Sequence, residues 1–234
     1  MRKGARQVRR HFSGKKNIYG KERGWAEPTR PYLERFVQDH GPLQMLDVGC
    51  GDGSLLHLLG SETDENLAVG VDLCRALVKK GKQHYGKIDF LIADAEHLPF
   101  QSGVFDVVIC VALLHHIFGE SLKASRRMQL IVLDEAYRVM HTVGTLFVRE
   151  LCPQNRIIAA CLFWLSSYLV NVHLRLVSSP LPSFAIVSFI TATELTLMLK
   201  QRFGNIKPLH QWPWRPHSIP MGDRVIFLSR KEET

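Results

Sequence analysis

The chain has 234 residues, of which 46% are hydrophobic and 22% are charged. This composition excludes a disordered or fibrous protein, and the length suffices for one domain with a complete core. The formal net charge is +8, yet residues 1–30 hold ten Lys and Arg against two Glu and so carry the whole excess. The charge therefore predicts a basic arm at the N-terminus and argues against a basic groove within the fold.

The region from Leu43 to Glu150 alternates short apolar runs with longer helical patterns. The predicted strands are Gln44–Val48, Leu67–Val71, Ile88–Ile92, Val104–Val111 and Thr145–Arg149, and the predicted helices are Ser54–Gly60, Cys74–His84 and Lys123–Met140. Strands rich in Val, Ile and Leu at nearly every position indicate burial on both faces. We therefore expect an α/β fold with a doubly wound, mostly parallel, seven-stranded Rossmann-like sheet.

The last third of the chain changes in character. An apolar stretch covers Ile157–Val177, but its uninterrupted part, Ile157–Val170, has 14 residues, whereas a membrane span needs roughly 20. We expect a buried or cap helix here, with an interfacial helix touching lipid and a true span as alternatives. Thr191 and Glu194 have capping-box spacing and predict a helix through Arg202.

Two closing strands are predicted after that helix, and these give the domain plan. They cover Asn205–His210 and Arg224–Leu228, and we expect them to form an antiparallel hairpin, so that the last strand of the sheet is antiparallel. The predicted domain plan is a basic N-terminal arm and leading helix in residues 1–40 and one domain in residues 41–234. Within that domain, residues 150–192 form an apolar cap insertion before the hairpin.

The five cysteines are dispersed and include no CxxC pair, which favours a reducing compartment over a disulfide scaffold or a zinc site. They are Cys50, Cys74, Cys110, Cys152 and Cys161. The N-terminus lacks the apolar core of a secretory signal, although Met1–Arg10 is rich in Arg and free of acids, as organellar presequences often are. We expect a cytoplasmic protein, with organellar targeting as the alternative.

The strongest chemical signal is the run DVGCGDG, Asp47 to Gly53, directly after the first strand. Glycines let a chain turn tightly and approach a ligand closely, and open α/β sheets bind ligands at the carboxyl ends of their strands. Asp72 ends the second strand, where a carboxylate can bind ribose hydroxyls. Asp47 and Asp52 would repel a dinucleotide's pyrophosphate, whereas they suit the ammonium and sulfonium of S-adenosylmethionine.

Beyond this turn, the sequence resembles the class I S-adenosylmethionine-dependent methyltransferases, within their type 11 group. The resemblance covers Leu43 to Glu150 and rests on DVGCGDG, VDL at 71–73, ADAEHLPF at 93–100, FDVV at 105–108 and LHH at 114–116. Residues 8–12, VRRHF, with Tyr19, also resemble the aromatic segment that folds over the cofactor in quinone- and biotin-pathway relatives. Lys15 and Lys16 depart from that pattern, since relatives carry small residues there.

The resemblance implies a cofactor site in which glycines shape the methionine pocket, Asp72 holds the ribose, Leu73 packs on the adenine and Asp94 reads its amino group. The implied cofactor residues are Asp47, Gly49, Cys50, Gly51, Gly53, Asp72, Leu73, Asp94, Ala95 and Val111. The alternatives are a purely structural glycine turn, a solvated helix cap at Asp72 and a turn acid at Asp94. Asp106 precedes a buried run and is interpreted as structural.

A general base is needed only if the acceptor must lose a proton. His115 and His116, at the end of the fourth strand, are the candidates, because imidazole titrates near neutrality; a positioning role is the alternative. No third ligand with useful spacing accompanies them, so we expect no metal. The aromatic run from Trp212 to Trp214 could line an acceptor pocket, although local packing is the commoner role of such residues in a hairpin connection.

Three functions remain open at this point. The first is methyl transfer to a small acceptor, hydrophobic or attached to a lipid or carrier protein, as the apolar insertion suggests; such an enzyme could contact a membrane peripherally. The second is a tRNA or other RNA methyltransferase that holds phosphates with Arg2 to Arg30. The third is a non-catalytic binding protein that keeps the fold.

Overall fold

The computed structural model describes residues 7, 9, 11, 12, 30–40, 42–60, 67–176, 185–204, 206–211 and 224–230. Its helices and strands follow the chain in the order α2 (Arg30–His40), β1 (Gln44–Val48), α3 (Ser54–Gly60), β2 (Leu67–Asp72), α4 (Arg75–His84), β3 (Ile88–Ile92), β4 (Phe105–Val111), the 3₁₀ turn η2 (Leu114–His116), α5 (Leu122–Val139), β5 (Met140–Leu151), α6 (Arg156–Leu176), α7 (Ala192–Phe203), β6 (Ile206–Gln211) and β7 (Arg224–Arg230). This alternation confirms the predicted α/β class.

The strands form one sheet in the order β3-β2-β1-β4-β5-β7-β6. The first five strands in chain order pair in parallel. β7 runs antiparallel to both β5 and β6, so the closing hairpin adds one edge to the parallel part. The carboxyl ends of β1, β2 and β4 therefore lie at one end of the sheet, and a ligand site is expected there.

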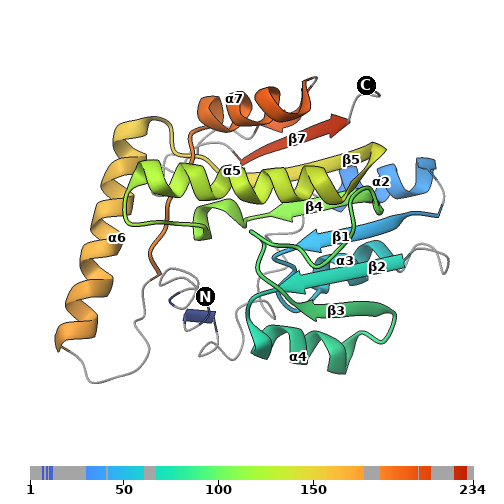
Figure 1. Ribbon diagram of the computed structural model, residues 1–234, viewed down its shortest axis with the longest axis horizontal. Coiled ribbons are helices and arrows are strands. Elements are labelled where there is room, and N and C mark those ends of the chain that lie inside the picture. The colour runs from blue at the N-terminus through green and yellow to red at the C-terminus, as the bar shows by residue number, and fades with distance from the viewer. Residues whose placement is uncertain are drawn as a thin grey trace.

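Helices cover both faces of the sheet (Figure 1). On one face, α5 and α7 bury residues such as Leu133 and Leu199 against Leu46, Val108 and Val148. On the other face, α2, α3 and α4 pack against inward-facing strand residues, among them Met45, Ile109 and Phe147. These two apolar layers explain why β1 and β4 are buried at nearly every position, as a covered parallel strand requires.

The sequence predicted strands that are buried on both faces, and β3 does not follow this prediction. Its Leu91 and Ile92 are 37% and 50% exposed, and Leu67 on the neighbouring strand is 62% exposed. β3 is the outer strand of the sheet, and the chain passes from it to β4 without an intervening helix. One face of this edge is therefore left without a covering layer, which an apolar sequence run could not reveal.

Most predicted boundaries are confirmed within one residue, but the strand predicted at Thr145–Arg149 begins five residues earlier. α5 ends at Val139, and Met140 already pairs with Phe105 of β4, so the chain passes from helix to strand without a loop. The capping box predicted for Thr191 and Glu194 is present at the start of α7. Asn205 and the aromatic run at 212–214 lie outside the described residues.

The apolar stretch after β5 forms α6, which stands across the end of the sheet that the arrowheads of β1 and β2 approach in Figure 1. Its inner side buries Ala159, Phe163 and Val170, and Phe163 and Val170 share a small cluster with Phe118 and Ile186. Within the described ranges, no helix combines the length and the apolar character that a membrane crossing requires.

Candidate functional site

The glycine-rich turn after β1 is a backbone cradle. Gly49, Gly51 and Gly53 have φ angles of 80°, 60° and 79°, in the left-handed region that only glycine adopts readily. The Gly49 and Cys50 N–H groups donate to the Val71 carbonyl at 2.8 and 3.0 Å, which ties the turn to β2. The turn is thus fixed in a shape that requires glycine at three alternate positions.

Two of these glycines, Gly49 and Gly53, are also closely packed by neighbouring side chains. A Cβ at Gly49 would lie 2.8 Å from Leu113 Cδ1, and a Cβ at Gly53 would lie 2.4 Å from the Phe90 ring. Leu113 follows Ala112, whose φ of 53° is unusual for a residue with a side chain. The chain leaving β4 therefore bends back over the turn, at the position where backbone strain often marks a functional site.

Asp72 links the ends of β1 and β2. Its carboxylate accepts hydrogen bonds from the Gly51 N–H at 2.9 Å and from the Cys74 N–H at 2.7 Å. Burial raises the pKa of Asp72 to about 6, although these two N–H bonds lower it. Each carboxylate oxygen has two lone-pair sites, so Asp72 keeps acceptor capacity for a ligand hydroxyl.

Asp47 is buried at 3% exposure near the end of β1. Burial, and secondarily the charge of Asp72, raises its pKa to about 7. A carboxyl group so removed from water favours a nearby cation, because a positive charge stabilises the ionised form. The geometry thus places two carboxyl groups of raised pKa beside a backbone cradle.

Asp52 does not supply the free negative charge that the sequence predicted for it. Asp52 is buried, but its carboxylate lies 2.6 Å from Lys80 Nζ of α4 and also accepts the Ser54 N–H. It therefore closes an ion pair between the turn and α4 and brings no uncompensated negative charge to a ligand. The attraction for a cation rests on Asp47 and Asp72.

The other predicted cofactor residues lie along the same end of the sheet. Asp94 follows β3, and its carboxylate accepts a hydrogen bond from the Glu96 N–H at 3.2 Å. This bond stabilises the turn after β3, which is the structural alternative considered for Asp94. Leu73, Ala95 and Val111 are partly exposed. Asp106, by contrast, accepts the Gln44 N–H at the start of β1, which is the far end of that strand and agrees with a structural role.

His115 belongs to η2, just beyond β4, and is paired with an acid. Glu150 Oε2 lies 2.7 Å from His115 Nδ1, while Glu150 Oε1 accepts the Leu114 N–H at 2.5 Å. Both side chains are buried. A carboxylate can only accept, so it fixes Nδ1 as the donor and leaves Nε2 as the basic nitrogen of the neutral ring.

Aromatic rings surround the histidine pair. The His115 ring stacks on the Phe189 ring, with centroids 5.2 Å apart. The centroids of the His115 and His116 rings are 4.1 Å apart. Phe12, from the N-terminal segment singled out in the sequence, contacts His116 edge to face at 5.0 Å. Residues far apart in the chain thus meet at η2, although Tyr19, Lys15 and Lys16 lie outside the described residues.

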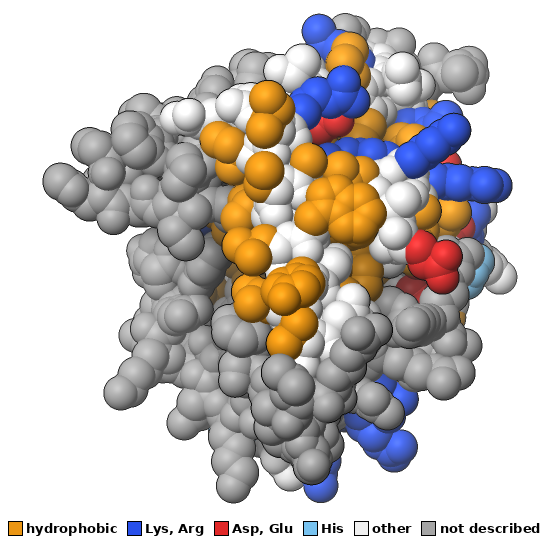
Figure 2. Space-filling model, turned by 90° about the vertical axis from the view of Figure 1, so that its left-hand side faces the viewer, with side chains coloured by type: hydrophobic (Ala, Val, Ile, Leu, Met, Phe, Trp, Pro, Cys, Tyr) orange, Lys and Arg blue, Asp and Glu red, His pale blue; other side chains and the backbone are white. Residues whose placement is uncertain are grey.

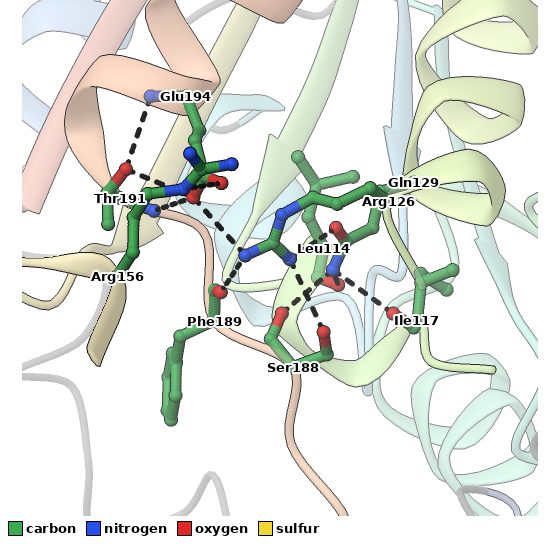
Figure 3. A network of polar contacts seen from close by, with 9 residues as sticks. All are labelled: Leu114, Ile117, Arg126, Gln129, Arg156, Ser188, Phe189, Thr191 and Glu194. Carbon is green, nitrogen blue, oxygen red and sulfur yellow. Dashed lines mark hydrogen bonds and ion pairs between the residues drawn. The ribbon is translucent and has the colours of Figure 1, made fainter. Parts of the chain in front are cut away.

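A polar network holds the segment before α7 against η2 (Figure 3). The fully buried Gln129 Nε2 lies within hydrogen-bond distance of the carbonyls of Leu114, Ile117 and Ser188, at 2.8 to 3.1 Å. Arg126 donates to the Phe189 carbonyl at 2.6 Å. The position of the Phe189 ring beside His115 is therefore set by side chains of α5.

The network continues from α5 to α6 through Glu194. Glu194 pairs with Arg126 at 3.3 Å and with Arg156 at 3.0 Å, and it closes the capping box of α7. Burial lowers the pKa of Arg126, while the nearby Glu194 carboxylate opposes that shift. The starts of α6 and α7 are thus tied to the helix that faces the site.

Sequence reasoning missed Glu150, Leu113 and Phe189. An acid closing a long apolar strand run was a readable signal for Glu150, since buried carboxylates need partners. Leu113 and Phe189 carry no such signal, because their contacts depend on the bend at Ala112 and on a segment distant in sequence.

A cavity of about 560 Å³ lies elsewhere, at the β3 edge. Its lining includes Lys82, Tyr85, Asp89 and Leu91 and none of the turn glycines or strand-end acids. We assign it no role, because it gathers no set of convergent polar groups. Among the described residues, no cluster of His, Cys, Asp and Glu could hold a metal ion.

The chain is similar in sequence and in fold to known methyltransferases. Residues 46–148 match the sequence model of a family described as "Methyltransferase domain". The chain is 34% identical over 77 residues to malonyl-[acyl-carrier protein] O-methyltransferase of Geobacter sulfurreducens, covering 32% of this chain and 29% of that protein. It is 31% identical over 140 residues to phthiotriol/phenolphthiotriol dimycocerosates methyltransferase of Mycobacterium tuberculosis, covering 57% and 48%.

A third relative has a different named substrate. Probable tRNA methyltransferase 9B of Homo sapiens is 25% identical over 119 residues, covering 50% of this chain and 24% of that protein. The chain thus spans less than half the length of each of these relatives. Among solved structures, a 1,6-didemethyltoxoflavin-N1-methyltransferase of Burkholderia thailandensis with bound S-adenosylhomocysteine has a TM-score of 0.62 at 14% identity, covering 98% and 87% of the two chains, and shows the shared fold.

Proposed function

We infer that residues 46–148, which match the sequence model of a methyltransferase domain, form a domain of the class I, type 11 kind, and we propose that the protein transfers a methyl group from S-adenosylmethionine to a small acceptor. The observation that carries the proposal is the cradle of three left-handed glycines beside Asp47 and Asp72, two carboxyl groups of raised pKa. The glycine cradle allows close approach of either kind of ligand, but the Asp47 and Asp72 carboxyl groups favour the ammonium and sulfonium of S-adenosylmethionine over a pyrophosphate.

Each residue of the site has a role in the proposal. The turn from Gly49 to Gly53 holds the methionine part, with Asp47 beneath it favouring positive charge, and the remaining lone pairs of Asp72 accept the ribose hydroxyls. Leu73 and Ala95 flank the adenine and Asp94 accepts from its amino group. Cys50 and Val111 complete the wall by backbone and apolar contact.

The cofactor supplies a methyl group on a positively charged sulfur. An acceptor lone pair forms the new bond to that methyl carbon while the carbon–sulfur bonding pair returns to sulfur, leaving a neutral thioether. The protein contributes mainly by holding the two reactants in line, an effect that can amount to about 7–11 kcal/mol. Where the acceptor carries a proton, Nε2 of His115 accepts it, because Glu150 occupies Nδ1.

The acceptor we propose is hydrophobic or attached to a lipid or carrier protein. The histidine pair contacts the aromatic rings of Phe12 and Phe189, and Phe163 and Ile186 of the cap segment are buried in one cluster with Phe118. Residues 150–192 thus act as an apolar cap on the acceptor side of a domain that spans residues 41–234. The named acceptors of the Geobacter and Mycobacterium relatives, a carrier-bound malonyl group and phthiotriol dimycocerosates, are of this class.

The test of the proposal is calorimetric titration with S-adenosylmethionine and S-adenosylhomocysteine. We expect micromolar binding that falls at least about tenfold in Asp72→Ala, since a hydrogen bond to a charged group contributes about 1.5–3 kcal/mol. Asp89→Ala, an exposed acid on β3, is the control and should bind normally. Absence of binding to folded wild-type protein would overturn the proposal and favour a non-catalytic relative.

The acceptor class needs a separate test, because the basic arm and the human relative keep RNA as a competitor. We expect the protein to bind bulk tRNA weakly, through contacts between the basic arm and the phosphates. Such binding should fall steeply as the salt concentration rises. Radiolabelled methyl transfer to a panel of phenolic lipids, quinols and acyl-carrier thioesters should exceed transfer to tRNA. Preferential labelling of tRNA would overturn the proposed acceptor class and leave the cofactor site intact.

A further inference from the structure

The outer face of α6 is apolar and exposed. Ile157 is 75%, Trp164 57%, Leu165 54% and Tyr168 65% exposed, and Cys161 is exposed between them. These residues recur at three- and four-residue intervals, so they form one stripe along the helix. Figure 2 shows hydrophobic side chains gathered along the face of the molecule that α6 forms, with white backbone and polar atoms between them.

The stripe is additional to the packing that folds the protein. The opposite side of α6 already buries Ala159, Phe163 and Val170. A surface helix normally carries polar residues on its outer side, and large exposed apolar patches on soluble proteins mark interaction sites. The exposed side of α6 therefore has the composition of a contact surface.

The exposed charges around the stripe are mainly cationic, although Arg156 is paired with Glu194. α6 contains no Asp or Glu along its 21 residues, and Arg156 at its start is 82% exposed. The first turn of α5 packs against α6 through Leu122 and carries the exposed Lys123 and, one turn on, Arg127. Glu120 is the exposed acid at this edge, and Figure 2 shows Lys and Arg side chains beside the stripe.

We propose that the outer face of α6 docks on an anionic lipid surface, with Trp164 and Tyr168 at the level of the headgroups. Trp and Tyr combine an apolar ring with a polar group and gather at membrane interfaces. Helices with an apolar face and flanking cations lie in the plane of such interfaces. The docking goes beyond the proposed methyl transfer, and vesicle binding is measured without cofactor or acceptor.

A probe on Cys161 tests the insertion directly. Cys161 is the exposed cysteine, whereas the other four are buried, so a polarity-sensitive fluorophore attaches within the stripe. Adding vesicles of phosphatidylcholine with phosphatidylglycerol should shift its emission to the blue, and pure phosphatidylcholine should do so far less. In a Cys161→Ser, Leu197→Cys protein the same probe sits on α7 and should not shift. An unshifted Cys161 probe overturns the proposal.

Co-sedimentation with the same vesicles separates the stripe from the basic arm. Leu165→Ser should lower vesicle affinity by about tenfold or more, because one apolar side chain no longer leaves water. Leu197→Ser is the matched control, since both leucines are 54% exposed, and should bind as the wild type does. Equal binding of both variants assigns the contact to another surface and overturns the proposal. Conversion of a dimer to a monomer by Leu165→Ser would identify the face as a contact between copies and would equally overturn it.

Discussion

His115 illustrates how a buried partner decides the chemistry of one side chain. Glu150 holds the loop after β4 through the Leu114 N–H and holds the imidazole through Nδ1. The same carboxylate therefore fixes where the ring lies and which nitrogen is basic. The stacked Phe189 keeps the ring plane in place. An enclosed, oriented histidine of this kind suits an acceptor whose proton must leave during transfer.

Replacing Glu150 by Gln should release this control, because an amide can donate to Nδ1 as readily as it accepts. Nitrogen NMR of the histidine side chains should find His115 protonated at Nδ1 in the wild type and mixed between tautomers in Glu150→Gln. With a proton-bearing acceptor, His115→Gln should reduce turnover by about 10²- to 10⁴-fold at unchanged cofactor affinity. An unchanged rate would show that the acceptor needs no base and that His115 only positions the loop.

At the scale of elements, the glycine turn depends on conformation and on space, and the two can be separated. Gly53 has φ +79° and its missing Cβ would overlap the Phe90 ring, whereas Gly103 has φ +72° with nothing within 4 Å. Gly53→Ala and Gly103→Ala therefore share the cost of a left-handed alanine, about 1–2 kcal/mol. The overlap should lower the unfolding free energy of Gly53→Ala by about 1–3 kcal/mol more. Equal losses in denaturant titrations would refute a close approach.

The sequence specified most of these elements because their signals are local. The DVGCGDG run, the capping box at Thr191 and the apolar strand runs each depend on neighbouring residues, and the structure has them where they were expected. What the sequence could not specify depends on distant contacts. The Lys80 ion pair that neutralises Asp52 and the exposed edge at Leu91 both arise from how helices are placed around the sheet.

The same limit applies to the apolar cap. Periodicity locates α6 but does not tell which of its apolar residues are buried, because both sides of the helix are apolar. The network from Gln129 through Arg126 and Glu194 decides how the starts of α6 and α7 meet η2. Its members lie up to 68 residues apart. A single sequence offers no way to pair residues at that separation.

At the scale of the whole molecule, the strand-end acids couple stability to pH. Asp47 and Asp72 have folded pKa values of about 7 and 6, against 3.8 for an ordinary Asp. Between pH 3.8 and these raised pKa values, the folded state binds more protons than the unfolded state. The free energy of unfolding therefore decreases as the pH rises through this range. Their contribution is fully present below about pH 4 and is lost as pH rises through 6 and 7. Glu135 and Glu194 have pKa values below the ordinary 4.5, so their contribution is constant above about pH 4.5 and falls only at lower pH.

The ligand-free protein should therefore lose thermal stability between pH 5 and 7.5, and Asp47→Asn should flatten the upper part of that slope. S-adenosylhomocysteine carries the ammonium but lacks the sulfonium, and it should bind more tightly as pH rises through the same window. Below the pKa, each carboxylate that must ionise lowers affinity by about tenfold per pH unit. The melting shift caused by the ligand should accordingly grow from pH 5 to 8 in the wild type and grow less in Asp47→Asn. A ligand-induced shift that is constant over this range would show that neither acid senses the bound positive charge.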